Sequence, residues 1–253
     1  MQEFSEDKDA LRYLQENVSP ESEREDVDIS DLKKPLFEKP DKLTPGEYEF
    51  EGKGGFKVSF KIVKCDNRFD TCYSTLKESG FEGKWHPIYG ILDLTISSDE
   101  FGYSMKYPSD GYAGSIYWLP GLSNPESELS CDTVDIGKRN IYLVGDTGFF
   151  ARPLDLLGFF HEIGHLATDP MLPHNEHTST YGMFGTLPMT PKRAAYQLQR
   201  EKVANDWLSQ NTNGLFRNLE VPSDLVQDYC DHVQLKSYRD ASRRRLERFL
   251  KDL

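Results

Sequence analysis

Cysteine is scarce in this sequence, and no two cysteines form a metal-binding pair. The 253 residues include four cysteines, and none of them have the Cys-x-x-Cys spacing that is typical of zinc ribbons and redox sites. We therefore expect reduced thiols without a role in metal binding. A disulfide is the alternative for Cys65 and Cys72, which could flank a hairpin.

Long apolar runs and an excess of basic residues are missing as well. No segment reaches the roughly eighteen consecutive apolar residues of a membrane-spanning helix. Residues 1–7 have neither the basic start nor the apolar run of a secretory signal. The 42 acidic residues outnumber the 30 basic ones, which gives a formal net charge of -12, whereas nucleic-acid binding depends on basic patches. These absences predict a cytoplasmic protein that binds neither membranes nor nucleic acid directly.

The first 45 residues differ in composition from the rest of the chain. They are rich in charge, chiefly acidic up to Asp31, and have prolines at positions 20, 35, 40 and 45. Only residues 6–18 have apolar side chains spaced for a short helix, and a segment with so little apolar surface cannot offset the entropy lost on ordering. Residues 1–45 are therefore predicted to be an acidic, flexible segment. A regulatory arm over a functional site is the alternative.

Residues 46–253 change their apolar period twice, which predicts one α+β domain. The first part, 46–150, alternates apolar and polar residues in several stretches, as expected for a largely antiparallel sheet. A helical period begins at Pro153, so residues 151–210 predict two helices, the second with Thr190 as N-cap and an end near Gln210. Residues 220–253 predict one or two amphipathic helices. The predicted strands are 48–50, 56–62, 88–96, 101–107, 114–119 and 140–144.

The first of the two predicted helices contains His161, Glu162 and His165 in an otherwise apolar sequence. Two histidines four residues apart lie on one face of a helix, at the separation that two imidazoles need to bind one zinc ion. Glu162 then lies beside the open metal position, where it can accept a proton from water as a general base. Ordinary buried histidines are the alternative, but they would leave three polar groups unpaired in a core. The motif predicts one Zn2+ ion and a hydrolytic site.

A hydrolytic zinc site needs a third protein ligand and one open position. The metzincin pattern is excluded, because it requires other residues where this chain has Thr168 and Met171. Another solution is a glutamate on the next helix, followed one turn later by Asp or Asn, which holds a ligand histidine by its free ring nitrogen. Glu201 and Asn205 have this spacing. A surface ion pair is the alternative for Glu201, and Asp169 is a weaker candidate ligand.

The two motifs together resemble those of the gluzincins. The likeness is greatest to the ImmA/IrrE type of cytoplasmic metallopeptidase, whose second helix has Glu-x-x-Ala-Asn followed by an aromatic residue, here Trp207. The likeness extends over about residues 153–210. The chain departs from that type at Val203, where an acidic residue is common, and it shows no helix-turn-helix segment for DNA binding.

The resemblance implies a zincin-like fold and a soluble metalloendopeptidase that cleaves a peptide or protein substrate. In that arrangement His161, His165 and Glu201 bind zinc, Glu162 is the catalytic base and Asn205 holds a ligand histidine. The strand over residues 140–144 would be an edge strand that pairs with an extended substrate.

Stabilisation of the transition state needs a further hydrogen-bond donor to the oxyanion. His174, His177 and Tyr181 lie between the two predicted helices, and each could be this donor; His232 is another candidate. If His174 or His177 were instead a fourth metal ligand, the zinc would be structural. A non-catalytic, zinc-containing binding or regulatory module is therefore the alternative function, and the oligomeric state is left open.

Overall fold

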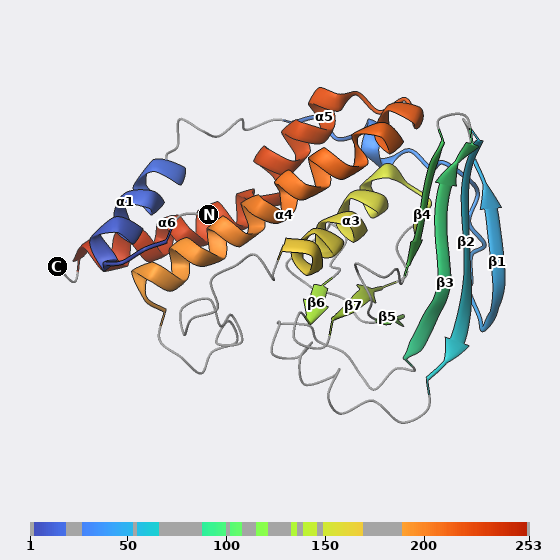
Figure 1. The fold of residues 1–253 in the computed structure, drawn as a ribbon, viewed down its shortest axis with the longest axis horizontal. Coiled ribbons are helices and arrows are strands. Elements are labelled where there is room, and N and C mark those ends of the chain that lie inside the picture. The colour runs from blue at the N-terminus through green and yellow to red at the C-terminus, as the bar shows by residue number, and fades with distance from the viewer. Residues whose placement is uncertain are drawn as a thin grey trace.

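The computed structural model shows an α+β arrangement in which a mixed sheet is followed by helices (Figure 1). Five residues singled out above lie outside the part of the chain that the structure describes: Cys72, Asp169, His174, His177 and Tyr181. The described residues are 3–18, 27–52, 55–65, 88–99, 102–107, 115–120, 133–135, 139–145, 149–168 and 189–251.

One sheet contains all seven strands of the described residues, in the order β1-β2-β3-β5-β7-β6, with β4 paired to β3. All six strands predicted from the alternation are confirmed, to within a few residues at their ends, and β6 is additional. The strands are β1 (Gly46–Glu51), β2 (Phe56–Lys64), β3 (Tyr89–Ser98), β4 (Tyr103–Tyr107), β5 (Ser115–Leu119), β6 (Thr133–Asp135) and β7 (Asn140–Val144).

The sheet is largely antiparallel, as predicted, but one of the six pairings among the described strands is parallel, so the sheet is mixed. Strands β5 and β7 pair in parallel, with Ile116 opposite Ile141. Four of the five residues in each of these strands are buried, as is usual for parallel strands covered on both faces. The direction of a strand relative to its neighbour is set by the connection between them, and the apolar pattern of a strand does not contain that information.

Strand β7 is not an edge strand, so the prediction for residues 140–144 is wrong in this respect. Strand β6 pairs with it in antiparallel register, with Val134 opposite Ile141 and Asp135 opposite Asn140. Sequence analysis missed β6 because three residues are too few to show a period of two.

The helices lie on one side of the sheet, and α3 lies between α4 and the strands (Figure 1). The main core forms where the buried face of the sheet meets α3; Phe60 and Ile96 from strands and Leu157 from α3 all belong to it. The helices are α1 (Asp7–Asn17), α3 (Pro153–Thr168), α4 (Pro191–Asn218), α5 (Ser223–Asp228) and α6 (Lys236–Lys251), with a 3-10 turn η2 (Asp31–Lys33) and a π-helix η7 (Tyr229–Gln234). None of the helices in the described ranges combines the length and apolar character needed to cross a membrane.

Helix α4 begins as predicted but continues past the expected end near Gln210. Thr190 is its N-cap, because its side chain accepts a hydrogen bond from the backbone N–H of Arg193. Residues 211–214, which were expected to end the helix, are part of it. The Thr212 hydroxyl donates to the carbonyl of Leu208 at 2.7 Å. Leu215 is fully buried one turn later. Tertiary burial of this face therefore outweighs the weak helix propensity of the Asn-Thr-Asn-Gly stretch.

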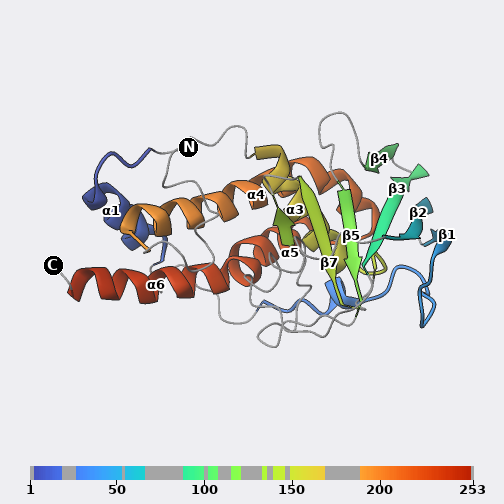
Figure 2. The same cartoon turned by 90° about the horizontal axis from the view of Figure 1, so that it is seen from below.

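The described residues of the segment 1–45 pack against the rest of the molecule, although a flexible segment was expected. The short helix predicted over residues 6–18 is confirmed as α1. It lies against α4 and α6 (Figure 2), with Leu14 fully buried beside residues of α4. Farther along, Leu32 is fully buried in the main core. A few well-placed apolar side chains are thus enough to anchor a segment whose average composition is polar.

Candidate metal centre

Helix α3 holds the two histidines in the interior of the protein. It begins at Pro153, and Asp155 in its first turn accepts hydrogen bonds from the backbone N–H and guanidinium of Arg152. The helix is buried on nearly all sides, which is why its sequence is apolar around the polar residues. His161 and His165 are 3% and 7% exposed, so their ring nitrogens are shielded from water and need partners within the protein.

Helix α4 crosses α3 in unusually close contact. A Cβ atom added to Gly164 would lie only 2.6 Å from the carbonyl oxygen of Ala204, so no larger residue fits without moving one of the helices. Glu201 lies one turn before this contact, and Asn205 follows it directly. The small residues at the crossing therefore bring the side chains of α4 within reach of the two histidines.

Three potential ligand atoms converge between the helices. Nε2 of His161 lies 3.0 Å from Nε2 of His165 and 3.1 Å from Oε2 of Glu201, and the distance from His165 to the same oxygen is 3.2 Å. Tetrahedral ligands at roughly 2.0–2.1 Å from one ion lie about 3.3–3.4 Å apart. The three atoms thus have nearly the spacing that a single metal ion imposes, and this buried group could hold one.

Asn205 determines which nitrogen of His161 is free. The side-chain nitrogen of Asn205 donates to the carbonyl oxygen of Cys230 at 3.0 Å, so its amide oxygen is the atom that faces Nδ1 of His161, at 2.7 Å. An amide oxygen only accepts, and Nδ1 must therefore carry the proton. Nε2 is left with its lone pair directed at Glu201, as expected for a metal-binding imidazole held by a second residue.

The contact between Nε2 of His161 and Oε2 of Glu201 consequently joins two acceptors. Two lone pairs 3.1 Å apart in a buried site repel each other unless a cation lies between them, either a proton or a metal ion. With the Nε2 of His165 also within 3.2 Å of that oxygen, the donor set of two imidazoles and a carboxylate fits a metal ion.

The ionisation of the site fits metal binding as well. Burial lowers the pKa of His165, and the neighbouring His161 lowers it further against the opposing effect of Glu201. Burial alone would raise the pKa of Glu201, but the two histidines, in their protonated forms, outweigh this effect and hold the pKa well below its usual range. A metal ion would take the place of those protons, because imidazole binds a metal in its neutral form and a carboxylate in its ionised form.

The structure thus brings together four of the residues singled out in the sequence, His161, His165, Glu201 and Asn205. Glu162, next to His161 on α3, is 9% exposed. His232 lies in the π-helix η7, where its Nδ1 is buried without a hydrogen-bond partner among the described residues.

Sequence reasoning missed two contributors to the site. One is the close contact at Gly164, which the spacing of the second motif does not show. The other is Tyr238 on α6, whose phenol is close enough to the carboxylates of Glu201 and Glu162 for both charges to raise its pKa. Nothing in the amphipathic sequence of residues 220–253 distinguishes this tyrosine, because only the packing of α6 on α4 places it there.

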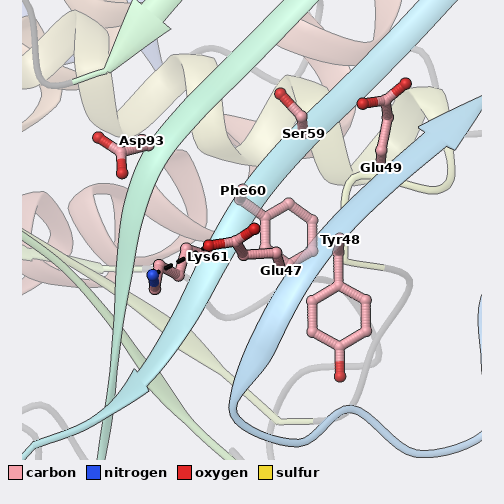
Figure 3. A pocket seen from close by; sticks show the side chains of 7 residues that line it. All are labelled: Glu47, Tyr48, Glu49, Ser59, Phe60, Lys61 and Asp93. Atoms are coloured by element: carbon pink, nitrogen blue, oxygen red, sulfur yellow. Dashed lines mark hydrogen bonds and ion pairs between the residues drawn. The ribbon is translucent and has the colours of Figure 1, made fainter.

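A hollow of about 290 Å³ on the sheet is separate from the metal centre. Its lining comes from β1, β2 and β3, and in Figure 3 the side chains of Glu47 and Lys61 contact each other across it. None of the potential metal ligands lines it. The lining residues are Glu47, Tyr48, Glu49, Ser59, Phe60, Lys61 and Asp93.

Comparison with known proteins gives no counterpart for this arrangement, since the chain matches no family model, no curated protein and no solved structure. Any functional conclusion therefore depends on the geometry of the site itself.

Proposed function

We propose that this protein is a soluble zinc metalloendopeptidase with a zincin-like, gluzincin-type centre, which hydrolyses peptide bonds in a peptide or protein substrate. The contact between Nε2 of His161 and Oε2 of Glu201 is the observation that supports this most directly. It places two acceptors 3.1 Å apart in a buried site, with the proton of His161 fixed on the opposite nitrogen by Asn205. A cation between them removes the repulsion.

Zinc is the metal that this donor set favours. Two imidazole nitrogens and one carboxylate oxygen are a common ligand set of hydrolytic zinc sites, whereas magnesium and calcium prefer sites made only of oxygen atoms. His161, His165 and Glu201 would hold the ion. When bound, it would polarise the scissile carbonyl and lower the pKa of the attacking water.

We assign the role of general base to Glu162, whose carboxylate can accept a proton. It neighbours His161 on helix α3 and is itself buried. Glu162 takes a proton from the attacking water and returns it to the leaving amine, a role worth about 10²–10⁴ in rate. Asn205 keeps His161 in the tautomer whose Nε2 would be free to bind the metal.

Metal content and hydrolysis of an unstructured protein test this proposal together. Elemental analysis of the purified protein is expected to give close to one zinc per chain, and casein or a quenched fluorescent peptide should be cleaved. A chelator should abolish the cleavage and added Zn2+ should restore it. In Glu201→Gln, which keeps the size of the side chain, both zinc and activity should fall sharply. Glu247→Gln, at an exposed position on α6, is the matched control.

Three outcomes would contradict parts of the proposal. Unchanged zinc in Glu201→Gln would remove Glu201 from the ligand set. Stoichiometric zinc without hydrolysis of any peptide would favour the non-catalytic zinc module. Tight binding of another divalent ion in preference to zinc would show that zinc is not the metal of this site.

A further inference from the structure

Helix α4 extends beyond α3 on one side of the candidate metal centre. The two helices cross where Gly164 meets Ala204, and α3 ends one turn later, at Thr168. Residues 191–200 of α4 precede Glu201 and continue the helix for about 15 Å, alongside α6 (Figure 2). We call residues 191–200 and 241–251 together the helical extension.

The helical extension is basic in a chain that is acidic as a whole. Residues 191–200 contain three basic residues and no acidic one, and residues 241–251 contain five basic residues and one acidic residue. Their formal charges are therefore +3 and +4, whereas the net charge of the whole chain is -12. Positive charge concentrated on one part of a surface attracts anionic groups to that part.

Arg245 joins the two helices of the extension. Its guanidinium donates to the side-chain oxygen of Gln197 on α4 at 2.7 Å, and its side chain is half-buried. Burial lowers the pKa of Arg245, and the neighbouring charges of Arg244 and Arg248 lower it further. We call Arg244, Arg245 and Arg248 the arginine cluster. Like charges held this close repel one another unless an anion lies among them.

The arginine cluster lacks a counter-charge within the part of the chain that the structure describes. Arg243, the preceding residue of α6, forms an ion pair with Asp240 at 3.4 Å. No carboxylate of the described residues forms such a pair with the cluster. Arg244 and Arg248 are exposed and, four residues apart, lie on one face of the helix. The cluster can therefore bind carboxylates that come from another molecule.

The arginine cluster also lies close to the candidate metal centre along α4. Gln197, which binds Arg245, and Glu201 are four residues apart, so they share one face of α4 and are separated by a rise of about 6 Å. An extended peptide spans about 3.3–3.6 Å per residue. A peptide bound to both places would therefore have its acidic residues only a few positions from the scissile bond.

We propose that the arginine cluster binds an acidic segment of the protein substrate and so presents a neighbouring peptide bond to the metal centre. This inference rests on the proposed peptidase function and names the substrate class. Guanidinium groups bind carboxylates through two parallel N–H···O hydrogen bonds, and the bound carboxylates would relieve the repulsion within the cluster. A nucleic acid fits less well, because a chain of net charge -12 repels its long phosphate backbone.

Matched peptides that carry a run of glutamates or a run of glutamines test the proposal. Binding of the fluorescein-labelled peptides is measured by fluorescence anisotropy on zinc-loaded Glu162→Gln, so that they are not cleaved. The glutamate peptide should bind about tenfold more tightly. In the wild type, quenched fluorescent substrates with the same runs should show a similar preference in KM. High salt should remove most of it, since the Debye length falls from about 10 Å at 0.1 M to about 3 Å at 1 M.

Arg244→Gln combined with Arg248→Gln removes two charges of the cluster at exposed positions. The preference for glutamate over glutamine should fall to about twofold or less in binding and in KM, with an unchanged melting temperature. Arg12→Gln combined with Arg217→Gln is the matched control, because both residues are exposed and lie on α1 and at the far end of α4. It changes the net charge equally and should keep the preference.

The outcomes separate this inference from the function on which it rests. Binding of the glutamate peptide through the cluster without hydrolysis of any peptide would confirm the binding surface and overturn its role in substrate selection. Metal-dependent hydrolysis without a preference for glutamate would overturn the docking site alone, as would an equal loss of preference in the control variant. Tighter binding of a single-stranded oligonucleotide than of the glutamate peptide would show that the partner is a nucleic acid.

Discussion

Two pairs of polar groups in this molecule have nearly the same separation and very different physical settings. On the sheet, Nζ of Lys61 lies 3.0 Å from the carboxylate of Glu47, with side chains 44% and 79% exposed. At the metal centre, Nε2 of His161 lies 3.1 Å from the carboxylate of Glu201, with side chains 4% and 6% exposed. Water screens the first pair, so its geometry has little energetic consequence. The second pair is buried from water, so the protein or a bound cation must offset the electrostatic cost of this contact.

The comparison shows that a short distance between a nitrogen and a carboxylate oxygen is not by itself a sign of function. What distinguishes the candidate metal centre is burial together with a fixed tautomer: Asn205 leaves no proton on the nitrogen that faces Glu201. The exposed pair has complementary charges and needs nothing further. Substitutions at the buried centre are expected to have large effects, and a substitution in the exposed pair is expected to have a small one.

The largest effect is expected from Glu162→Gln at the buried centre. The amide keeps the size of the side chain but cannot accept the proton of the attacking water. We expect kcat to fall by about 10²–10⁴, with zinc content and circular dichroism unchanged, as measured on the purified variant with a fluorescent peptide. Full activity in this variant would exclude Glu162 as the base.

A smaller effect is expected where the helices cross. Gly164→Ala places a Cβ atom 2.6 Å from the carbonyl oxygen of Ala204, so α3 and α4 must separate, which costs about 1–3 kcal/mol. Denaturant unfolding should show this loss, and zinc affinity should fall with it because the ligands come from both helices.

Gly214→Ala is the control for that change, since a Cβ atom at Gly214 meets nothing within 4 Å. Here α4 should gain up to about 1 kcal/mol from improved helix propensity. Equal stability of the two alanine variants would show that the helices are not in tight contact at Gly164.

Asn205→Ala should affect the metal through the tautomer of His161. Without the amide oxygen, Nδ1 no longer holds its proton in place, and removal of such a partner typically lowers metal affinity by about 10–100-fold. Competition with a zinc-binding dye measures this. Asn211→Ala, on the exposed side of the same helix, should leave zinc affinity unchanged, and a similar loss in both variants would point to a general effect on α4.

The smallest effect is expected on the sheet. Glu47→Gln removes the charge that faces Lys61, and exposed pairs of this kind contribute at most about 1 kcal/mol. The free energy of unfolding should change little, and kcat and zinc content should not change. A large loss of stability here would contradict the contrast between the two settings.

Some features were accessible from the sequence because they depend on local order. The apolar alternation located the predicted strands, and Pro153 and Thr190 marked the starts of α3 and α4. The spacing of His161 and His165 placed both rings on one face of a helix. Other features depend on contacts between distant segments: the end of α4 is set by the burial of Leu215, and the parallel pairing of β5 and β7 by their connection.

The sequence by itself determined the chemical types and helical spacing of the potential ligands, because one turn of a helix fixes which side chains share a face. Only the tertiary structure decided that Glu201 lies within 3.2 Å of both histidines. It also decided that Asn205 sets the proton of His161, and that the charges of Glu201 and Glu162 raise the pKa of Tyr238 on α6. The physical reason is that these relations depend on how closely α3, α4 and α6 pack, and this closeness depends on Gly164 and on burial over the whole core rather than on any local pattern.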